Sequence, residues 1–237
     1  MTHLLLQAAA DTASPTSTGS SALKFITGGG VIGYIIVLLS IVALAFVIIH
    51  FVQIRASVQL PRDRINAVKE LLARGQFEQA LQYAQLPAND CYFLRTLAPG
   101  LKRFIASPFG AFEMKSALEE SGVEQTARLY RTMDVIGVIG SVGPLLGLLG
   151  TVQGMIGAFE TVASSAAHDS TYYEALAYNI AIALITTFQG LVVAIPCVSL
   201  YSFFRNRVDR LAGDAAAEME EVVAIIESSS KTKVARA

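Results

Sequence analysis

Three long apolar blocks stand out in the pattern of hydrophobic and polar residues along the chain. They run from about Val31 to Val52, from about Val135 to Phe159 and from about Ala175 to Phe204, and none contains Asp, Glu, Lys or Arg. A helix needs about 20 apolar residues to cross a bilayer, and each block is long enough. Three uncharged blocks of this length are not typical of buried helices in a soluble protein. We therefore expect an all-α integral membrane protein with three transmembrane helices.

The sequence between the first two blocks shows helical spacing. Apolar residues recur every three or four positions after Arg62 and again after Phe77, with Gly75 between the two runs and Pro87 at the end of the second. This pattern predicts a helical hairpin. Residues 92–105 then predict a further amphipathic helix.

Two of the predicted transmembrane helices extend beyond their apolar blocks. Residues 112–132 are rich in helix formers and run into the second block with no breaker except Gly122. The tail from Arg205 continues the third block, and its apolar residues recur at helical spacing, at Val208, Leu211, Ala215, Met219, Val222 and Ile226. We expect these extensions to pack together in a cytoplasmic helical bundle. No strand-like alternation occurs along the chain.

The basic residues predict one orientation in the membrane. Of the 18 Lys and Arg residues, eleven lie between Arg55 and Arg131, six lie between Arg205 and Arg236, and only Lys24 precedes the first block. Cytoplasmic segments carry the basic excess, so the C-terminus is expected in the cytoplasm and the N-terminus outside it. The expected order is a periplasmic segment (1–30), transmembrane helix 1 (31–53), a cytoplasmic helical domain (54–133), transmembrane helix 2 (134–160), a periplasmic loop (161–174), transmembrane helix 3 (175–204) and a cytoplasmic C-terminal helix and tail (205–237).

The first block is longer than the apolar region of a cleaved signal peptide, and a polar stretch precedes it. Residues 11–21 are rich in Ser, Thr and Ala, which predicts a flexible segment. Residues 1–10 fit either a remnant of an export signal or a short surface helix.

Composition narrows the possible functions. Hydrophobic residues make up 53% of the 237 positions and charged residues only 16%, against roughly 25% in soluble domains. The net charge of −1 gives no indication of nucleic-acid binding. Two distant Cys and three scattered His predict neither a disulfide framework nor a metal site, and no cofactor is expected. No HExxH motif, intramembrane Asp pair or Ser–His pair indicates an enzyme.

Glycines form a row along the second block. They recur at steps of three or four residues, and those from Gly140 onward fall on one face of the helix, including Gly143, Gly147, Gly150 and Gly154. Such a row permits close helix packing in lipid. The packing partner is open: another helix of the same chain, an identical copy or a different chain. Pro144 lies within this row and is expected to kink or loosen the helix.

The third block carries a weakly polar face. Asn179, Thr186, Gln189 and Gly190 lie close to one side of the helix, and Thr187 flanks it. Thr hydroxyls often bond back to their own helix, but an amide in hydrocarbon needs a partner or water. The face therefore predicts a polar seam. The same helix also contains Pro196.

No carboxylate, Lys or Arg lies inside any of the three blocks. Asp134 and Glu160 bracket the second block at its two interfaces. A proton relay normally uses a titratable side chain in the membrane. If the protein conducts protons, another chain has to supply that group.

The segment GPLLGLLGTVQGMIGAF, residues 143–159, resembles the MotA/TolQ/ExbB proton channel family. The segment ALITTFQGLVVAIP, residues 183–196, resembles the matching segment of ExbB and TolQ. The resemblance implies a three-span subunit of the bacterial inner membrane that assembles as a homo-oligomeric ring, a pentamer in the better-understood cases. The ring surrounds an ExbD- or TolR-like partner whose single membrane helix carries an essential Asp. Ion flow then drives a motion that energises an envelope process such as outer-membrane transport.

The resemblance carries over to individual residues. Thr151 matches the Thr of the family's GLLGTV motif, and Thr187 matches the Thr of its ALxxT motif, which implies that both face the ion path. The chain departs from ExbB and TolQ at Ile182, which stands where those proteins have a Glu, on the same face as Asn179 and Thr186. MotA-type stators also lack that Glu. Gln189, which is not typical of its place, is expected to add a polar group to the path.

Other functions stay open beside an ion-driven motor. One is a non-conducting membrane scaffold whose helical hairpin docks cytoplasmic proteins. If the chain is a motor subunit, its output could be import across the outer membrane, envelope maintenance, surface motility or flagellar rotation. Flagellar rotation is the least favoured, because MotA-type stators are longer and have four spans. The choice between H⁺ and Na⁺ is also open.

Overall fold

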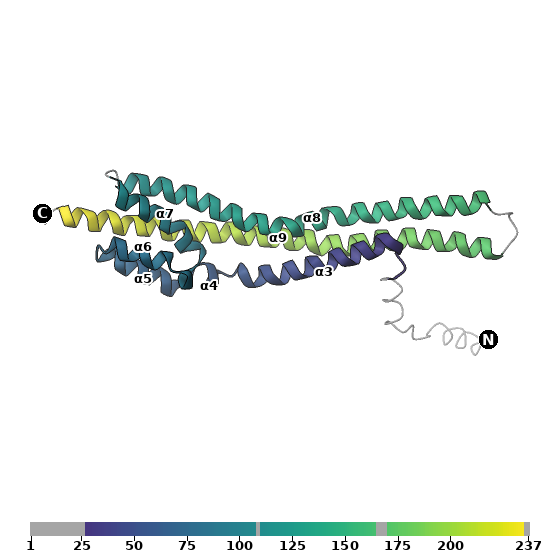
Figure 1. Ribbon diagram of the computed structural model, residues 1–237, viewed down its shortest axis with the longest axis horizontal. Coiled ribbons are helices and arrows are strands. Elements are labelled where there is room, and N and C mark those ends of the chain that lie inside the picture. The colour runs from purple at the N-terminus through teal and green to yellow at the C-terminus, as the bar shows by residue number, and fades with distance from the viewer. Residues whose placement is uncertain (1–26, 108–109, 165–169, 235–237) are drawn as a thin grey trace, which may run out of the picture. The chain divides into compact units, whose positions relative to one another are not determined.

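The computed structural model describes residues 27–107, 110–164 and 170–234 (Figure 1). Within these ranges the chain is almost entirely helical and contains no β-strand, which confirms the predicted all-α class. The helices, in chain order, are α3 (Gly30–Gln53), α4 (Ala56–Gln59), α5 (Arg62–Ala73), α6 (Phe77–Gln85), the short 3-10 helix η1 (Pro87–Asn89), α7 (Tyr92–Ala106), α8 (Gly110–Ser164) and α9 (Ser170–Val234). The predicted N-terminal segment lies almost wholly outside the described residues.

Three helices are long and apolar enough to cross a membrane, namely α3 and the apolar parts of α8 and α9. Their outward faces carry large apolar side chains, such as Leu38 of α3 (62% exposed) and Leu145 of α8 (63% exposed). A soluble protein rarely exposes apolar surface on this scale, but lipid or another membrane helix accommodates it. The three predicted spans are therefore present as helices.

The chain divides into two compact units. The first comprises residues 1–42 and 139–197, and the second comprises residues 43–138 and 198–237. Each of α3, α8 and α9 contributes residues to both units. We describe each unit by itself.

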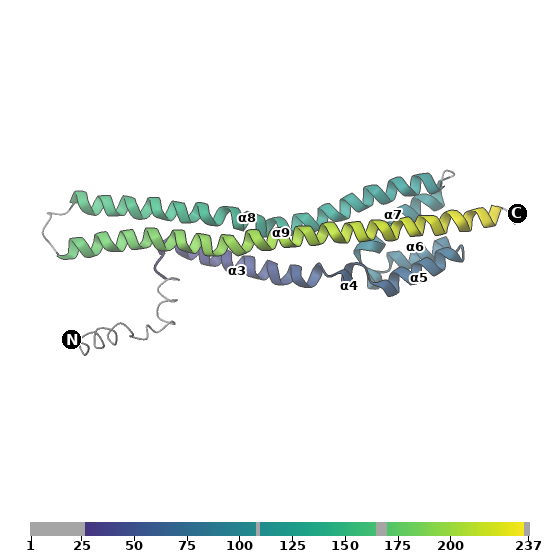
Figure 2. The same ribbon diagram turned by 180° about the vertical axis from the view of Figure 1, so that it is seen from behind.

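The second unit is a helical bundle built around one apolar core. Helices α5, α6 and α7 contribute to this core together with the first part of α8 and the last part of α9 (Figures 1 and 2). Its fully buried side chains include Val68, Leu72, Phe93, Leu94, Leu97, Leu101, Met114, Val222 and Ile226. All six apolar positions predicted along the tail of α9 are buried. Burying one such side chain contributes roughly 1.5–3 kcal/mol, so the helical spacing explains why this tail packs into the bundle.

The predicted hairpin of the second unit is formed by α5 and α6, and Gly75 makes the turn between them. Gly75 has a φ of 73°, a conformation that favours glycine. Its amide donates to the Leu72 carbonyl at 3.0 Å, and the next amide, of Gln76, donates to the Leu71 carbonyl at 3.0 Å. These two bonds cap α5 in the manner of a left-handed helix end.

An ion-pair cluster joins α5 to α9 within the second unit. Lys69 donates to Glu218 and, at 2.6 Å, to Glu221. Burial alone would lower the pKa of Lys69, but the bonds and charges of the two carboxylates outweigh it, so the pKa is raised above its ordinary value. The cluster therefore stabilises the charged form of Lys69 despite its burial.

In the first unit, the last part of α8 and the first part of α9 run side by side in opposite directions (Figures 1 and 2). The beginning of α3 packs against α9 in the same unit. This three-helix arrangement holds nearly all residues of the predicted site.

Candidate functional site

The candidate site is the contact between α8 and α9 in the first unit, which we call the glycine seam. On the α8 side it consists of Gly143, Gly147, Gly150, Gly154 and Gly157, and on the α9 side of Asn179, Ala183, Thr186, Thr187, Gly190 and Ala194. The two sets come from segments about 40 residues apart in the chain, and the antiparallel helices bring them together.

The glycines of the seam allow the two backbones to touch. A methyl group on Gly190 would lie 2.5 Å from the Gly143 carbonyl oxygen, and one on Gly154 would lie 2.7 Å from the Asn179 carbonyl oxygen. Separations this short are not tolerated between real atoms, so any larger residue would force the helices apart. The predicted row of small residues is thus occupied by a helix of the same chain in this structure.

Thr186 and Thr187 face the seam differently. Thr186 is completely buried against Gly150, and its hydroxyl lies 3.0 Å from the carbonyls of Ile182 and Ala183 in its own helix. Thr187 is half-buried, and its hydroxyl lies 3.2 Å from the Gly147 carbonyl of α8 as well as 3.2 Å from the Ala183 carbonyl. Thr187 therefore contributes a hydroxyl that contacts both helices.

Thr151 lies beside the seam on α8. It is half-buried, and its hydroxyl donates to the Leu148 carbonyl at 2.6 Å. A hydroxyl that donates its one proton still has lone pairs to accept a hydrogen bond. Thr151 and Thr187 can therefore accept a hydrogen bond from a protonated group or from water, or coordinate a cation, while their own protons stay bonded to backbone carbonyls.

Asn179 extends the seam toward the end of α8. Its side-chain nitrogen donates to the Thr161 hydroxyl at 3.2 Å, and the Thr161 hydroxyl donates in turn to the Gly157 carbonyl at 2.8 Å. A methyl group on Gly157 would lie 3.0 Å from the Asn179 side-chain oxygen. The amide is therefore held between the helices, as the predicted polar seam requires.

Gln189 and Ile182 lie toward α3. Gln189 is only 8% exposed, and its side-chain oxygen would meet methyl groups on Gly29 and Gly33 at 2.5 and 2.8 Å. Ile182 lies near Gly30. A methyl group on Gly30 would lie 3.8 Å from the Ile182 side chain. The structure thus brings Gln189 and Ile182 to the contact between α9 and α3, apart from the seam hydroxyls that face α8.

The two prolines are contained within continuous helices. Pro144 is half-buried and Pro196 is exposed, and neither interrupts its helix. Proline has no amide hydrogen, so each removes one backbone bond from its helix.

Sequence reasoning passed over Gln153, which lies on α8 two positions after Thr151. Its side chain is exposed on the outer face, whose other members are mainly large apolar residues such as Leu149 (53% exposed) and Ile156 (53% exposed). An amide on a lipid-facing surface is costly unless another chain or water pairs with it. The sequence does contain a signal for this residue. Gln153 is a lone amide whose helical spacing matches that of the exposed apolar residues of α8 rather than that of the glycines.

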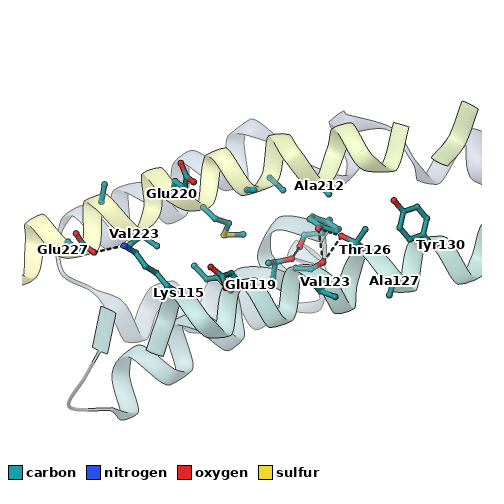
Figure 3. A pocket seen from close by; sticks show the side chains of 18 residues that line it. Lys115, Glu119, Val123, Thr126, Ala127, Tyr130, Ala212, Glu220, Val223 and Glu227 are labelled. Atoms are coloured by element: carbon teal, nitrogen blue, oxygen red, sulfur yellow. Dashed lines mark hydrogen bonds and ion pairs between the residues drawn. The ribbon is translucent and has the colours of Figure 1, made fainter. Parts of the chain in front are cut away.

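A second feature, the helix groove, lies in the second unit between α8 and α9 and has a volume of about 950 Å³ (Figure 3). Its floor includes Tyr92, whose hydroxyl lies 2.8 Å from the Thr126 hydroxyl. Glu119 comes from the α8 wall and Glu220 from the α9 wall, and the Lys115–Glu227 pair, at 3.5 Å, spans the groove. None of the predicted site residues lines this groove.

Comparison with known proteins places the seam within a region that matches a family model. Residues 95–217 match the model of the MotA/TolQ/ExbB proton channel family. The chain is also 29% identical over 191 residues to a protein of Methanothermobacter thermautotrophicus named as a biopolymer transport protein ExbB homolog; the match covers 80% of this chain and 64% of that relative. The family match contains α8 and the part of α9 up to residue 217, which includes both sides of the seam, and the chain belongs to the MotA/TolQ/ExbB proton channel family.

Proposed function

We propose that this chain is an ExbB/TolQ-like subunit of an ion-driven motor in the bacterial inner membrane. It uses the proton or sodium gradient to energise an envelope process such as outer-membrane transport. The observation that carries the proposal is the family match over residues 95–217, which includes the whole glycine seam together with Thr151 and Thr187.

The titrating group comes from a partner chain. The three apolar blocks contain no Asp, Glu, Lys or Arg, so the subunit offers no carboxylate of its own at membrane depth. His50, near the end of the first block, has its Nδ1 2.6 Å from the Phe46 carbonyl of its own helix. An ExbD/TolR-like protein with one membrane helix and an Asp in it supplies the missing charge. The half-buried hydroxyls of Thr151 and Thr187 then accept hydrogen bonds from the protonated Asp or from the water molecules of a hydrated ion.

The subunit acts as a homo-oligomer, with five copies in a ring. Because α8 and α9 of one chain already fill the glycine seam, the contacts with other copies and with the partner use the outward faces of these helices. Gln153, exposed on α8, is a candidate for an interchain hydrogen bond on that face. In lipid such a bond is worth about 0.6–2 kcal/mol.

The distribution of basic residues supports an orientation with the helical bundle in the cytoplasm. Eleven of the 18 Lys and Arg residues lie between the first and second apolar blocks and six follow the third. In this orientation residues 54–133 and 205–237 are cytoplasmic.

The test is ion flux into vesicles that contain the subunit and its partner. Thr187→Val removes the hydroxyl with almost no change of shape and is expected to abolish gradient-driven function while the assembly stays intact. Thr187→Ser keeps the hydroxyl and is expected to retain most of the flux. Thr132→Val serves as a control, since the Thr132 hydroxyl bonds only to the Leu129 carbonyl of its own helix, at 2.8 Å. Normal flux in the Thr187→Val protein would contradict a role for this hydroxyl.

The helix groove favours a second candidate function, a non-conducting scaffold that docks cytoplasmic proteins. Its occupant would be an amphipathic helix with basic residues along its edges, because the groove is apolar and Glu119 and Glu220 on its two walls have no ion-pair partner among the described residues. A scaffold predicts that Val123→Glu, which places a charge on a groove residue that is 72% exposed, abolishes function. It also predicts that Thr187→Val has no effect, the opposite of the motor.

A further inference from the structure

A small pocket in the second unit combines apolar and basic residues. We call it the boundary pocket; its volume is about 310 Å³, and it is lined by Ile54, Phe203, Asn206, Arg207, Arg210, Leu211 and Asp214. Ile54 directly follows α3, and the other residues belong to α9. Phe203 lies at the end of the third apolar block, and the rest lie just beyond it. None of these residues takes part in the glycine seam or the helix groove.

The pocket residues on α9 lie where the third apolar block ends, which corresponds to the edge of the bilayer. Phe203, Arg207, Arg210 and Asp214 recur at steps of three or four and therefore share one face of the helix. Phe203 is half exposed at the end of the apolar block. At a rise of about 1.5 Å per residue, Arg207 lies about 6 Å beyond it along the helix, which is the depth of the lipid headgroups.

The two guanidinium groups of the pocket have no partner in the chain. Neither Arg207 nor Arg210 forms an ion pair or hydrogen bond with any described residue, and Asp214, although it lines the same pocket, pairs with neither. Arg205 differs, because its guanidinium lies 5.7 Å from the centre of the Tyr130 ring. Two unpaired arginines that line one pocket leave several N–H donors available to an anion bound there.

Part of the pocket lining is apolar and packed. Ile54 is 2% exposed and Leu211 is 4% exposed, and both line the pocket beside the arginines. A guanidinium binds a phosphate through two parallel hydrogen bonds, and apolar lining residues strengthen those bonds by excluding water. Phe203 extends the apolar surface toward the membrane, on the side where acyl chains lie.

We propose that the boundary pocket binds a phosphate anion, and that in the membrane this anion is the headgroup of an anionic phospholipid. Arg207 and Arg210 bind the phosphate, and Ile54, Phe203 and Leu211 contact the glycerol and the first part of an acyl chain. Basic pockets between membrane helices commonly hold such headgroups. Asp214 lies one turn beyond Arg210, toward water, so it reduces the positive charge of the pocket to a net +1 and weakens binding without occupying the phosphate position.

The experiment uses the full chain purified in detergent and titrated with phosphatidylglycerol, phosphatidylethanolamine or inorganic phosphate. Bound lipid is counted by native mass spectrometry, and thermal unfolding is followed in parallel. Arg207→Gln and Arg210→Gln are each expected to weaken phosphatidylglycerol binding about 10-fold, since each removes a charge-assisted hydrogen bond to the phosphate. Asp214→Asn is expected to tighten it several-fold, a gain that a misfolded variant could not produce.

Arg131→Gln is the matched control, because it removes an exposed basic side chain close to the start of the second apolar block but outside the pocket. Its binding should equal that of the wild type. Preference for phosphatidylglycerol over inorganic phosphate supports the headgroup as the ligand, whereas equal binding of inorganic phosphate supports the anion site and excludes the lipid as its source. The proposal is overturned if neither ligand binds, or if Arg131→Gln weakens binding as much as the pocket variants do.

Discussion

Gly143 and Gly190 face each other across the contact between α8 and α9 so closely that a methyl group on Gly190 would lie 2.5 Å from the Gly143 carbonyl oxygen. Helices in lipid gain little from burying apolar side chains, because lipid tails are equally apolar. Close packing of this kind is therefore a main source of their association. The seam joins the two helices that carry Thr151 and Thr187.

Replacing a seam glycine should separate the helices. Gly190→Ala is expected to lower the free energy of unfolding by about 1–3 kcal/mol, because the new methyl group meets backbone that cannot move aside cheaply. Gly213→Ala is the control on the same helix, since nothing lies within 4 Å of the position its methyl group would take. That change should be neutral or stabilise α9 by up to about 1 kcal/mol. Thermal unfolding of both variants in the same detergent measures the difference. Equal stabilities of the Gly190→Ala and Gly213→Ala proteins would contradict the close contact at the glycine seam.

Ile182 offers a test of the position where ExbB and TolQ have a Glu. In this chain Ile182 lies near Gly30 of α3, at a contact between two apolar helices. Ile182→Glu places a carboxyl group there, and we expect a loss of about 1–3 kcal/mol in stability, the usual cost of burying a polar group without a partner. Leu184→Gln, at an outward position that is 66% exposed, controls for a polar group in the span. A fully stable Ile182→Glu protein that gains flux would instead indicate that this position faces the ion path.

Gln153 should matter to assembly and not to the fold of one chain. Its side chain is exposed on α8 and makes no hydrogen bond with a described residue. Gln153→Leu is expected to weaken association between chains by about 0.6–2 kcal/mol, or roughly 3- to 30-fold, while leaving the helix content unchanged. Dilution of the complex followed by native mass spectrometry measures this. An unchanged or tighter complex would show that Gln153 faces lipid.

The Lys69 cluster should stabilise the second unit in a pH-dependent way. The pKa of Lys69 is raised in the folded state, so its contribution is complete below the ordinary pKa of about 10.5 and disappears as the pH rises through the folded value. Lys69→Met should therefore lower stability by about 1 kcal/mol at pH 8. The difference from the wild type should shrink above pH 10.5, and unfolding curves at pH 8 and pH 11 measure it. A constant difference would mean that Lys69 acts through its aliphatic chain.

Much of the fold could be read from the sequence because its elements are local. The stripe from Val208 to Ile226 has helical spacing, and every predicted position in it is buried. Gly75 and Pro87 both lie between α-helices, because Gly75 permits a positive φ and Pro87, which begins η1 after the end of α6, lacks an amide hydrogen.

The partners of each helix face could not be read in the same way. The glycine spacing predicts a close contact but not which helix makes it. Gln189 lies near Thr186 on the helix surface, yet it turns toward α3, because Gly29 and Gly33 leave the space that its amide fills. The helix groove and the boundary pocket depend on distances between segments far apart in the chain, which no local pattern contains.

The most direct test of the central claim is native mass spectrometry of the complex extracted gently from its own membranes. The motor account predicts a ring of five copies that carries two copies of a small single-span protein with an Asp in its membrane helix. The identity of that partner would then indicate which envelope process is driven. A ring without such a protein, or a single copy bound to soluble proteins, would contradict the motor account and favour the scaffold.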